Sequence, residues 1–139
     1  MSEERWRAFL LERPRTAKLA TTRRDGRPHI APIWIAVDDD GAVIFTTGAT
    51  SLKGRSIRRD PRISMCVDDD RPPFSFVILE GTAEVTEDPD EMLRAATRIG
   101  GRYMGEDRAE EFGRRNGQAG ELLVKLNPSR VIAREGISD

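Results

Sequence analysis

Closely spaced turn signals divide the chain into short strand-like segments, and this pattern restricts the fold more than any other feature. Over 17–21, candidate inward residues alternate with polar or small ones, as in a strand with one buried face. Asp25-Gly26 then marks a hairpin turn before a second run, Ile30–Val37. Similar runs follow at 42–47, 63–67, 74–85, 122–126 and 130–134. About seven short strands, mostly joined by hairpins, predict a small antiparallel β-barrel.

Helix signals occupy the segments between these runs. Ser2 is a candidate cap for a helix over 2–12, and Thr50 or Ser51 for one over 51–59. Asp88-Pro89 starts a third helix, and 106–115 reads as a further helical stretch. The predicted fold class is α+β, mainly antiparallel β: a barrel with peripheral helices, formed by one domain over 1–139.

Two prolines and a glycine carry positional information. Pro28 and Pro32 have no N–H to donate, so the strand over Ile30–Val37 is expected either to lie at a sheet edge or to leave its ladder locally. Gly81 is expected at a bulge or bend in the long run 74–85.

Composition excludes several classes of protein. The 23 basic and 24 acidic residues give a net charge of -1, whereas a general nucleic-acid binder usually has a basic excess. No apolar run approaches the ~18 residues of a membrane span, and the first ten residues do not resemble a secretory signal. A single cysteine, Cys66, excludes an internal disulfide framework. The expected location is the reducing cytoplasm.

Side chains suited to catalysis are sparse. His29 is the one histidine, no nucleophile motif lies near it, and Cys66 lies within an apolar strand. The aspartate runs 38–40 and 68–70 lack the spacing of a calcium loop and are interpreted as turns, so no metal site is predicted. If the chain is an enzyme, a cofactor is expected to carry the chemistry.

One segment has the composition of a phosphate site. In FTTGATSLKGRSIRRDPR, hydroxyl groups and cations surround the predicted start of a helix, where free N–H groups favour anions. A phosphate there would accept charge-assisted hydrogen bonds. The alternative is a solvated, charged helix face. The candidate phosphate residues are Thr46, Thr47, Ser51, Lys53 and Arg55.

An ordered set of segments resembles the pyridoxamine-phosphate-oxidase-like flavin/deazaflavin split-barrel superfamily, and within it the coenzyme F-420-dependent oxidoreductases found in actinobacteria. The matching segments are LATTRRDGRPHIAPIWIAVDDDG, FTTGATSLKGRSIRRDPRISMCVDDDRPPFSFVILEGTAEV, GRYMGEDRAEEFGRRN and ELLVKLNPSRVIA. True pyridoxamine-phosphate oxidases are longer and carry a C-terminal substrate-binding segment, so oxidation of vitamin B6 is not expected.

The resemblance implies a split β-barrel that forms a homodimer, with cofactor sites at the subunit interface. It implies that the cofactor ring lies along Ala31–Ile35, with its phosphate on the candidate residues above. It also implies that Met65 and Cys66 lie on the strand under the cofactor and that Pro73–Phe76 borders the pocket. The full implied set is Ala31, Pro32, Ile33, Trp34, Ile35, Thr46, Thr47, Ser51, Lys53, Arg55, Met65, Cys66, Phe74 and Ser75.

The function implied by the resemblance is transfer of a hydride from reduced F-420 to an unsaturated small molecule. F-420 ends in a lactyl oligoglutamate tail, and Arg58, Arg59 or Arg71 are candidates to bind it. Tyr103 is interpreted as a packing residue rather than a proton donor. Two alternatives stay open: an oxidoreductase of the same fold that uses flavin mononucleotide (FMN), and a non-catalytic protein that binds a flavin, a deazaflavin or haem.

Overall fold

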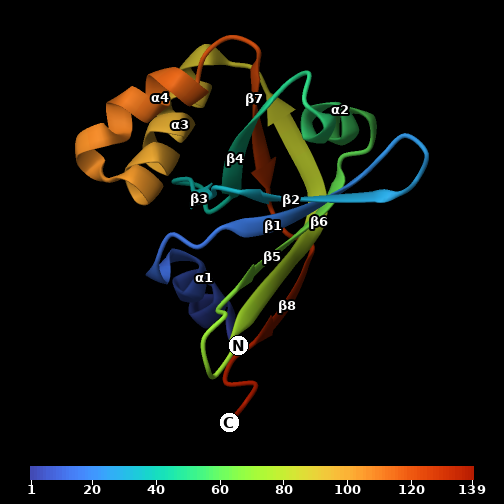
Figure 1. The fold of residues 1–139 in the computed structure, drawn as a ribbon, viewed down its shortest axis with the longest axis vertical. Helices are drawn as coiled ribbons and strands as arrows, with labels where there is room; N and C mark the ends of the chain where they lie inside the picture. Colours follow the sequence, from blue (N-terminus) through green and yellow to red (C-terminus); the bar gives the residue numbers. More distant parts are fainter.

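The predicted strands pair into one curled antiparallel sheet, described by a computed structural model of all 139 residues (Figure 1). The strand order is β2-β1-β5-β6-β7-β4-β3, and β8 pairs with β6 off this path. This arrangement, with helices outside the sheet, is the predicted split barrel. The strands are β1 (Ala17–Thr22), β2 (Pro28–Ile33), β3 (Ala36–Val37), β4 (Val43–Gly48), β5 (Arg62–Asp68), β6 (Phe76–Thr86), β7 (Glu121–Leu126) and β8 (Arg130–Arg134).

Four α-helices surround the sheet. Figure 1 shows α3 and α4 beside each other near β3, α2 near the upper ends of β4 and β6, and α1 near the two termini. Ser51 caps α2 by accepting a hydrogen bond from the Gly54 N–H, and Asp88 caps α3 through the Glu91 N–H. The helices are α1 (Glu3–Glu12), α2 (Leu52–Arg59), α3 (Pro89–Met104) and α4 (Ala109–Asn116), with a short 3-10 turn, η1, at Glu106–Arg108.

The long strand β6 changes partner at the predicted bend. It pairs with β8 over Phe76–Glu80 and with β7 over Ala83–Thr86. Gly81 lies between these two stretches, and a Cβ atom there would come within 2.9 Å of Leu126 Cδ1. A larger residue would therefore crowd the Leu126 side chain and the Asn127 carbonyl at the point where β6 changes partner.

The edge position of β2 is confirmed, because β2 pairs with β1 alone and begins the strand order. The prediction of one continuous strand over Ile30–Val37 is wrong. The strand stops after Ile33 and resumes as β3 at Ala36, on the other margin of the sheet. The intervening residues, Trp34 and Ile35, are held by side chains of α3 instead of by a neighbouring strand.

Two apolar clusters hold the layers together. The larger fills the barrel and includes Phe9, Phe45 and Met65, all almost fully buried. The smaller lies under α3 and joins Met92 and Ile99 to the outer side of β4 and β7. Because burying one large apolar side chain stabilises the fold by about 1.5–3 kcal/mol, the smaller cluster holds α3 against the sheet.

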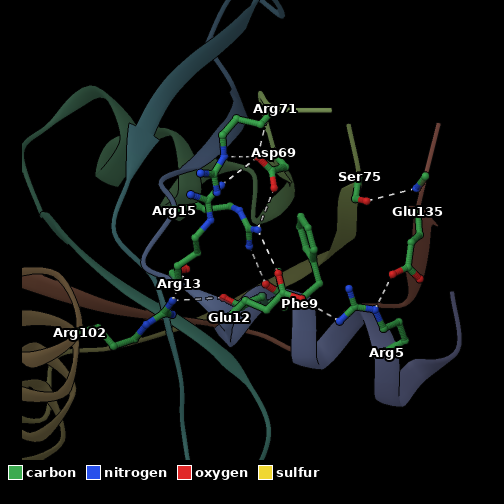
Figure 2. A network of polar contacts seen from close by, with 12 residues as sticks. Arg5, Phe9, Glu12, Arg13, Arg15, Asp69, Arg71, Ser75, Arg102 and Glu135 are labelled. Carbon is green, nitrogen blue, oxygen red and sulfur yellow. Dashed lines mark hydrogen bonds and ion pairs between the residues drawn. The ribbon is translucent and has the colours of Figure 1, made fainter. Parts of the chain in front are cut away.

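An ionic network joins α1 to the loop between β5 and β6 (Figure 2). Asp69 accepts hydrogen bonds from Arg13 at 2.9 Å and Arg15 at 3.3 Å, and Arg71 lies 3.6 Å away. The Arg15 guanidinium also stacks over the Phe9 ring at 4.1 Å. The network anchors the loop that carries Phe74 to the end of the molecule that holds the termini (Figures 1 and 2).

Candidate cofactor-binding site

A cleft of about 350 Å³ opens where β2, β4, α2 and β7 meet, with α3 and α4 along one side. It gathers residues from six elements that are distant in the sequence. Six of the predicted site residues line it: Pro32, Ile33, Trp34, Thr46, Thr47 and Lys53. The other lining residues are Gly48, Ile99, Asn116 and Glu121.

The polar end of the cleft lies at the start of α2. Thr46 and Thr47 end β4, and Lys53 lies in the first turn of α2. The amides of Leu52 and Lys53 have no acceptor within the helix, because they precede its first complete turn. Lys53 forms no ion pair within 4 Å of an acid, so its ammonium group is available to an anion.

Ser51 shapes this end of the cleft. Its hydroxyl donates to the Gly48 carbonyl at 2.7 Å and accepts from the Gly54 N–H at 3.0 Å. Thr47 Oγ1 lies 3.1 Å from Ser51 Oγ. A Cβ atom on Gly54 would clash with the Gly48 carbonyl oxygen, so glycine lets α2 approach β4 closely. Ser51 thereby holds the strand end and the helix start together.

The apolar wall of the cleft is fixed by α3. The Trp34 and Tyr103 rings stack with centroids 4.9 Å apart and planes within 4°. The Tyr103 hydroxyl donates to the Arg15 carbonyl at 2.6 Å and accepts from the Ile35 N–H at 3.1 Å. Arg102 donates to the Ile35 carbonyl at 2.9 Å. Both polar groups of the Ile35 backbone are therefore satisfied by α3, and Trp34 is held against the cleft.

Tyr103 is thus a packing residue, as the sequence analysis proposes. Its hydroxyl proton is used by the Arg15 carbonyl, and burial raises the pKa of Tyr103 above its ordinary value. Arg102 further joins the end of α1 by donating to the carbonyls of Leu10 at 3.2 Å and Arg13 at 3.1 Å. These contacts make α3 a brace for the segment between β2 and β3.

Several predicted site residues lie outside the cleft. Met65 and Ile35 point into the barrel core, each only 1% exposed, and Ala31 faces the same interior opposite Leu19. Arg55 is exposed on α2. The remaining four are Ser51, which lies behind the lining as the cap of α2, Cys66, half-buried on the outer face of β5, and Phe74 and Ser75, which belong to the loop before β6.

The loop residues are occupied elsewhere. Phe74 is exposed and has a positive φ of 62°, and Ser75 Oγ accepts a hydrogen bond from the Gly136 N–H at 3.3 Å. Burial, with the nearby Asp68 charge, raises the pKa of the Cys66 thiol, so the thiol is a poor nucleophile.

The three arginines considered for an oligoglutamate tail also lie outside the cleft. Arg58 pairs with Glu87 at 3.0 Å, and Arg59 donates to the Thr22 carbonyl at 2.6 Å. Arg71 lies beside Asp69 in the loop before β6.

Sequence reasoning missed Ile99, Asn116 and Glu121. They enter the cleft from α3, from the end of α4 and from the start of β7. Glu121 is opposite Gly48 in the register of β4 and β7. Only that long-range pairing brings it to the cleft, and the local sequence contains no signal for it.

Comparisons with known proteins place this geometry in a family. Residues 2–134 match the sequence profile of pyridoxamine 5'-phosphate oxidase. The chain belongs to the pyridoxamine 5'-phosphate oxidase family. Its fold is similar to that of Rv2991, a conserved hypothetical protein from Mycobacterium tuberculosis, with 31% identity and a TM-score of 0.84 over 96% of this chain and 84% of the other.

Two further solved structures have folds similar to that of this chain. An F-420 reductase has 27% identity and a TM-score of 0.66, over 90% of this chain and 94% of the reductase. HutZ, described as a haem storage protein from Vibrio cholerae, has 15% identity and a TM-score of 0.73, over 96% of this chain and 95% of HutZ. The likeness to HutZ shows the shared fold alone.

The cleft of this family member combines polar donors at one end with an apolar wall. Lys53, the Thr46 hydroxyl and the first amides of α2 are donors suited to a phosphate, whereas the Thr47 hydroxyl proton is used by Ser51. Ile33, Trp34 and Ile99 supply an apolar wall beside them. The chain has no group of three or more His, Cys, Asp or Glu side chains that could hold a metal ion, and no helix long and apolar enough to cross a membrane.

Proposed function

We propose that this chain is an oxidoreductase that uses coenzyme F-420 to reduce an unsaturated small molecule such as an enone or a conjugated tetrapyrrole. The observation that carries the proposal is the cleft, in which phosphate donors at the start of α2 lie beside an apolar wall that ends at Trp34. The likeness to an F-420 reductase over nearly the full length of both chains supports the deazaflavin in particular.

Each part of the cleft has a role in this proposal. Lys53, Thr46 and the free amides at the start of α2 hold the phosphate. Pro32, Ile33 and Trp34 orient the ring and exclude water from one side of it. When bound in its reduced form, F-420 supplies a hydride, two electrons and one proton, to an electron-poor carbon of the acceptor.

Water supplies the second proton of the reduction. The Tyr103 hydroxyl already donates to the Arg15 carbonyl, and the Cys66 thiol lies on the outer face of the sheet. Neither group is available as an acid in the cleft, and the two titratable side chains that do line it, Lys53 and Glu121, lie at the phosphate end, away from Trp34. The protein therefore acts by binding, orientation and exclusion of water around the reacting pair.

The functional unit in this proposal is a homodimer. The outer face of the sheet carries Ile30, Pro32, Cys66, Ile78 and Ile132 on β2, β5, β6 and β8, and Ile30 is 68% exposed. Lys18 of β1 lies within this face, opposite Pro32 and Cys66 in the strand register, and pairs with Asp68 at 3.0 Å, while Arg130 lies 3.7 Å from Glu80. A partly apolar face that also carries ion pairs is typical of a surface that binds another protein.

Pro32 connects that face to the cleft. It is one of the outer-face residues of β2 and also lines the cleft. A second copy on the outer face would reach the open side of the cleft and cover a ring bound there. The proposed interface thus completes the cofactor site.

FMN and haem are the competing ligands. FMN has the same phosphate-bearing chain and would use the same donors. Haem is less well matched, because no His, Cys, Met or Tyr side chain lines the cleft. The one histidine, His29, lies on β2 outside the cleft lining.

Turnover tests the proposal. Reduced F-420 is mixed anaerobically with the protein and a panel of cyclic enones and tetrapyrroles, and its oxidation is followed by absorbance. We expect acceptor-dependent oxidation with F-420 and little with reduced FMN. Turnover with FMN alone would assign the protein to the flavin-dependent branch. Tight binding without turnover of any acceptor would identify it as a cofactor carrier.

A further inference from the structure

Glu121 is an acid in the cleft, at the end where the phosphate donors lie. It starts β7, opposite Gly48, and the Ala49 N–H donates to the neighbouring Gly120 carbonyl at 2.8 Å. This pairing places the carboxylate beside the end of β4 and the start of α2. An acid in this position opposes anion binding, so its presence needs an explanation.

Lys53 and Glu121 are the two charged side chains among the ten residues that line the cleft. They form no ion pair with each other within 4 Å, so both charges interact with a ligand bound between them. Both side chains are partly buried, which strengthens their interaction with a bound charge relative to water. Burial raises the pKa of Glu121, and the positive charge of Lys53 opposes that rise.

The two charges act oppositely on each negative charge of a bound phosphate. Lys53 favours a second negative charge, and Glu121 disfavours it. A phosphate monoester, as in FMN, carries about 1.5 to 2 negative charges at pH 7. A phosphodiester carries one, and the phosphate of F-420 is a diester because it joins the ring's side chain to the lactyl tail.

We propose that Glu121 is a specificity-determining residue that cancels the advantage of a doubly charged phosphate, so that the cleft prefers a phosphodiester over a phosphate monoester. The proposal rests on the proposed function, because it takes the cleft as the phosphate site. It goes further by naming the residue that separates F-420 from FMN.

A matched pair of ligands isolates the phosphate charge. FMN and its phosphate methyl ester share one ring and one side chain, and differ by one negative charge at pH 8. Their dissociation constants are measured for wild type, for Glu121→Gln and for a control, Glu84→Gln. Glu84 is an exposed acid on β6 outside the cleft, so the control makes the same change of charge elsewhere.

We expect wild type to bind the methyl ester at least as tightly as FMN. Glu121→Gln should shift the ratio of the two dissociation constants in favour of FMN by about tenfold. A tenfold shift corresponds to about 1.4 kcal/mol, which is the size of effect expected for a single nearby charge. Glu84→Gln should leave the ratio unchanged. An equal ratio in wild type and Glu121→Gln would overturn the proposal, as would failure of the cleft to bind either ester.

Binding of F-420 itself separates the two claims. If wild type binds F-420 but Glu121→Gln keeps the wild-type ratio, the proposed function stands and the role of Glu121 fails. If the ratio shifts as expected but reduced F-420 is neither bound nor oxidised, Glu121 discriminates phosphate charge in a site with another natural ligand.

Discussion

Among single residues, a few hydrogen-bond donors that line one cleft determine the proposed cofactor binding. The phosphate residues could be predicted in part from the sequence, because Thr46 and Lys53 lie close together in the chain around one helix start. Ser51 was in the same set, but its hydroxyl caps the helix and bonds Gly48. Glu121 could not be predicted, because it reaches the cleft only through the pairing of β4 with β7.

Replacement of Lys53 tests the phosphate assignment. Lys53→Ala removes one charged hydrogen-bond donor, so we expect it to weaken F-420 binding by about 1.5–3 kcal/mol. Isothermal titration measures the change. Arg58→Ala serves as the control, because Arg58 lies on the same helix but pairs with Glu87 outside the cleft. Equal affinities for wild type and a folded Lys53→Ala protein would remove the assignment.

The pKa of Glu121 predicts a pH-dependent effect on stability. Burial raises this pKa in the folded protein above the value of about 4.3 expected in the unfolded chain. Glu121 therefore stays protonated to a higher pH in the folded state than in the unfolded state. As the pH rises from the unfolded-state pKa to the folded-state pKa, Glu121 lowers the free energy of unfolding increasingly. Below the unfolded pKa the effect is absent.

Glu121→Gln removes that destabilising contribution. We expect its Tm to exceed the wild-type Tm at pH 7 and the two values to converge as the pH falls to about 4. Thermal unfolding followed by circular dichroism at several pH values measures the difference. A variant that melts below wild type at pH 7 would show that the ionised carboxylate is stabilised in the fold.

At the scale of elements, α3 determines the shape of the cleft. The pattern over Ile30–Val37 predicts a strand, and this prediction is correct as far as Ile33, where β2 ends. The break at Trp34–Ile35 was missed because its cause lies about 70 residues along the chain: Tyr103 and Arg102 bind the Ile35 backbone. A local pattern describes strand propensity but not a competing partner from a distant helix.

Loss of the Tyr103 hydroxyl tests this role of α3. Tyr103→Phe keeps the ring that stacks on Trp34 but leaves the Ile35 N–H and the Arg15 carbonyl without their partner. We expect a loss of about 1–3 kcal/mol in the free energy of unfolding and weaker F-420 binding. Urea denaturation and ligand titration measure the two effects. Unchanged values in both would mean that the hydroxyl does not position the segment.

At the scale of the whole molecule, the curled sheet has an inner face that fills the barrel and an outer face that is partly apolar (Figure 1). The hairpin spacing predicts the fold class, and Gly81 predicts a bulge or bend at the place where β6 changes partner, but not the change of partner itself. The strand order could not be predicted, since pairings such as β4 with β7 join segments far apart in the chain.

The outer face yields a prediction about assembly. Ile30 is 68% exposed on β2, the edge strand of the proposed interface, so Ile30→Asp should leave the fold intact while opposing association. We expect wild type to sediment as a dimer at micromolar concentration, and the variant as a monomer that binds F-420 more weakly. Leu93→Asp is a matched control, because Leu93 is exposed on α3 away from that face. A monomeric wild type that still binds the cofactor would contradict the dimer.

The proposed function requires the cleft beside Trp34 to bind F-420 in preference to FMN. The chain has two tryptophans, of which Trp34 lines the cleft and Trp6 is 5% exposed in the barrel core. Titration of the protein with each cofactor, followed by tryptophan fluorescence, therefore reports on the cleft. We predict saturable quenching by F-420 with a micromolar or lower Kd, weaker quenching by FMN, and loss of most of the signal in Trp34→Phe. Preference for FMN, or quenching by F-420 that persists in Trp34→Phe, would contradict the account.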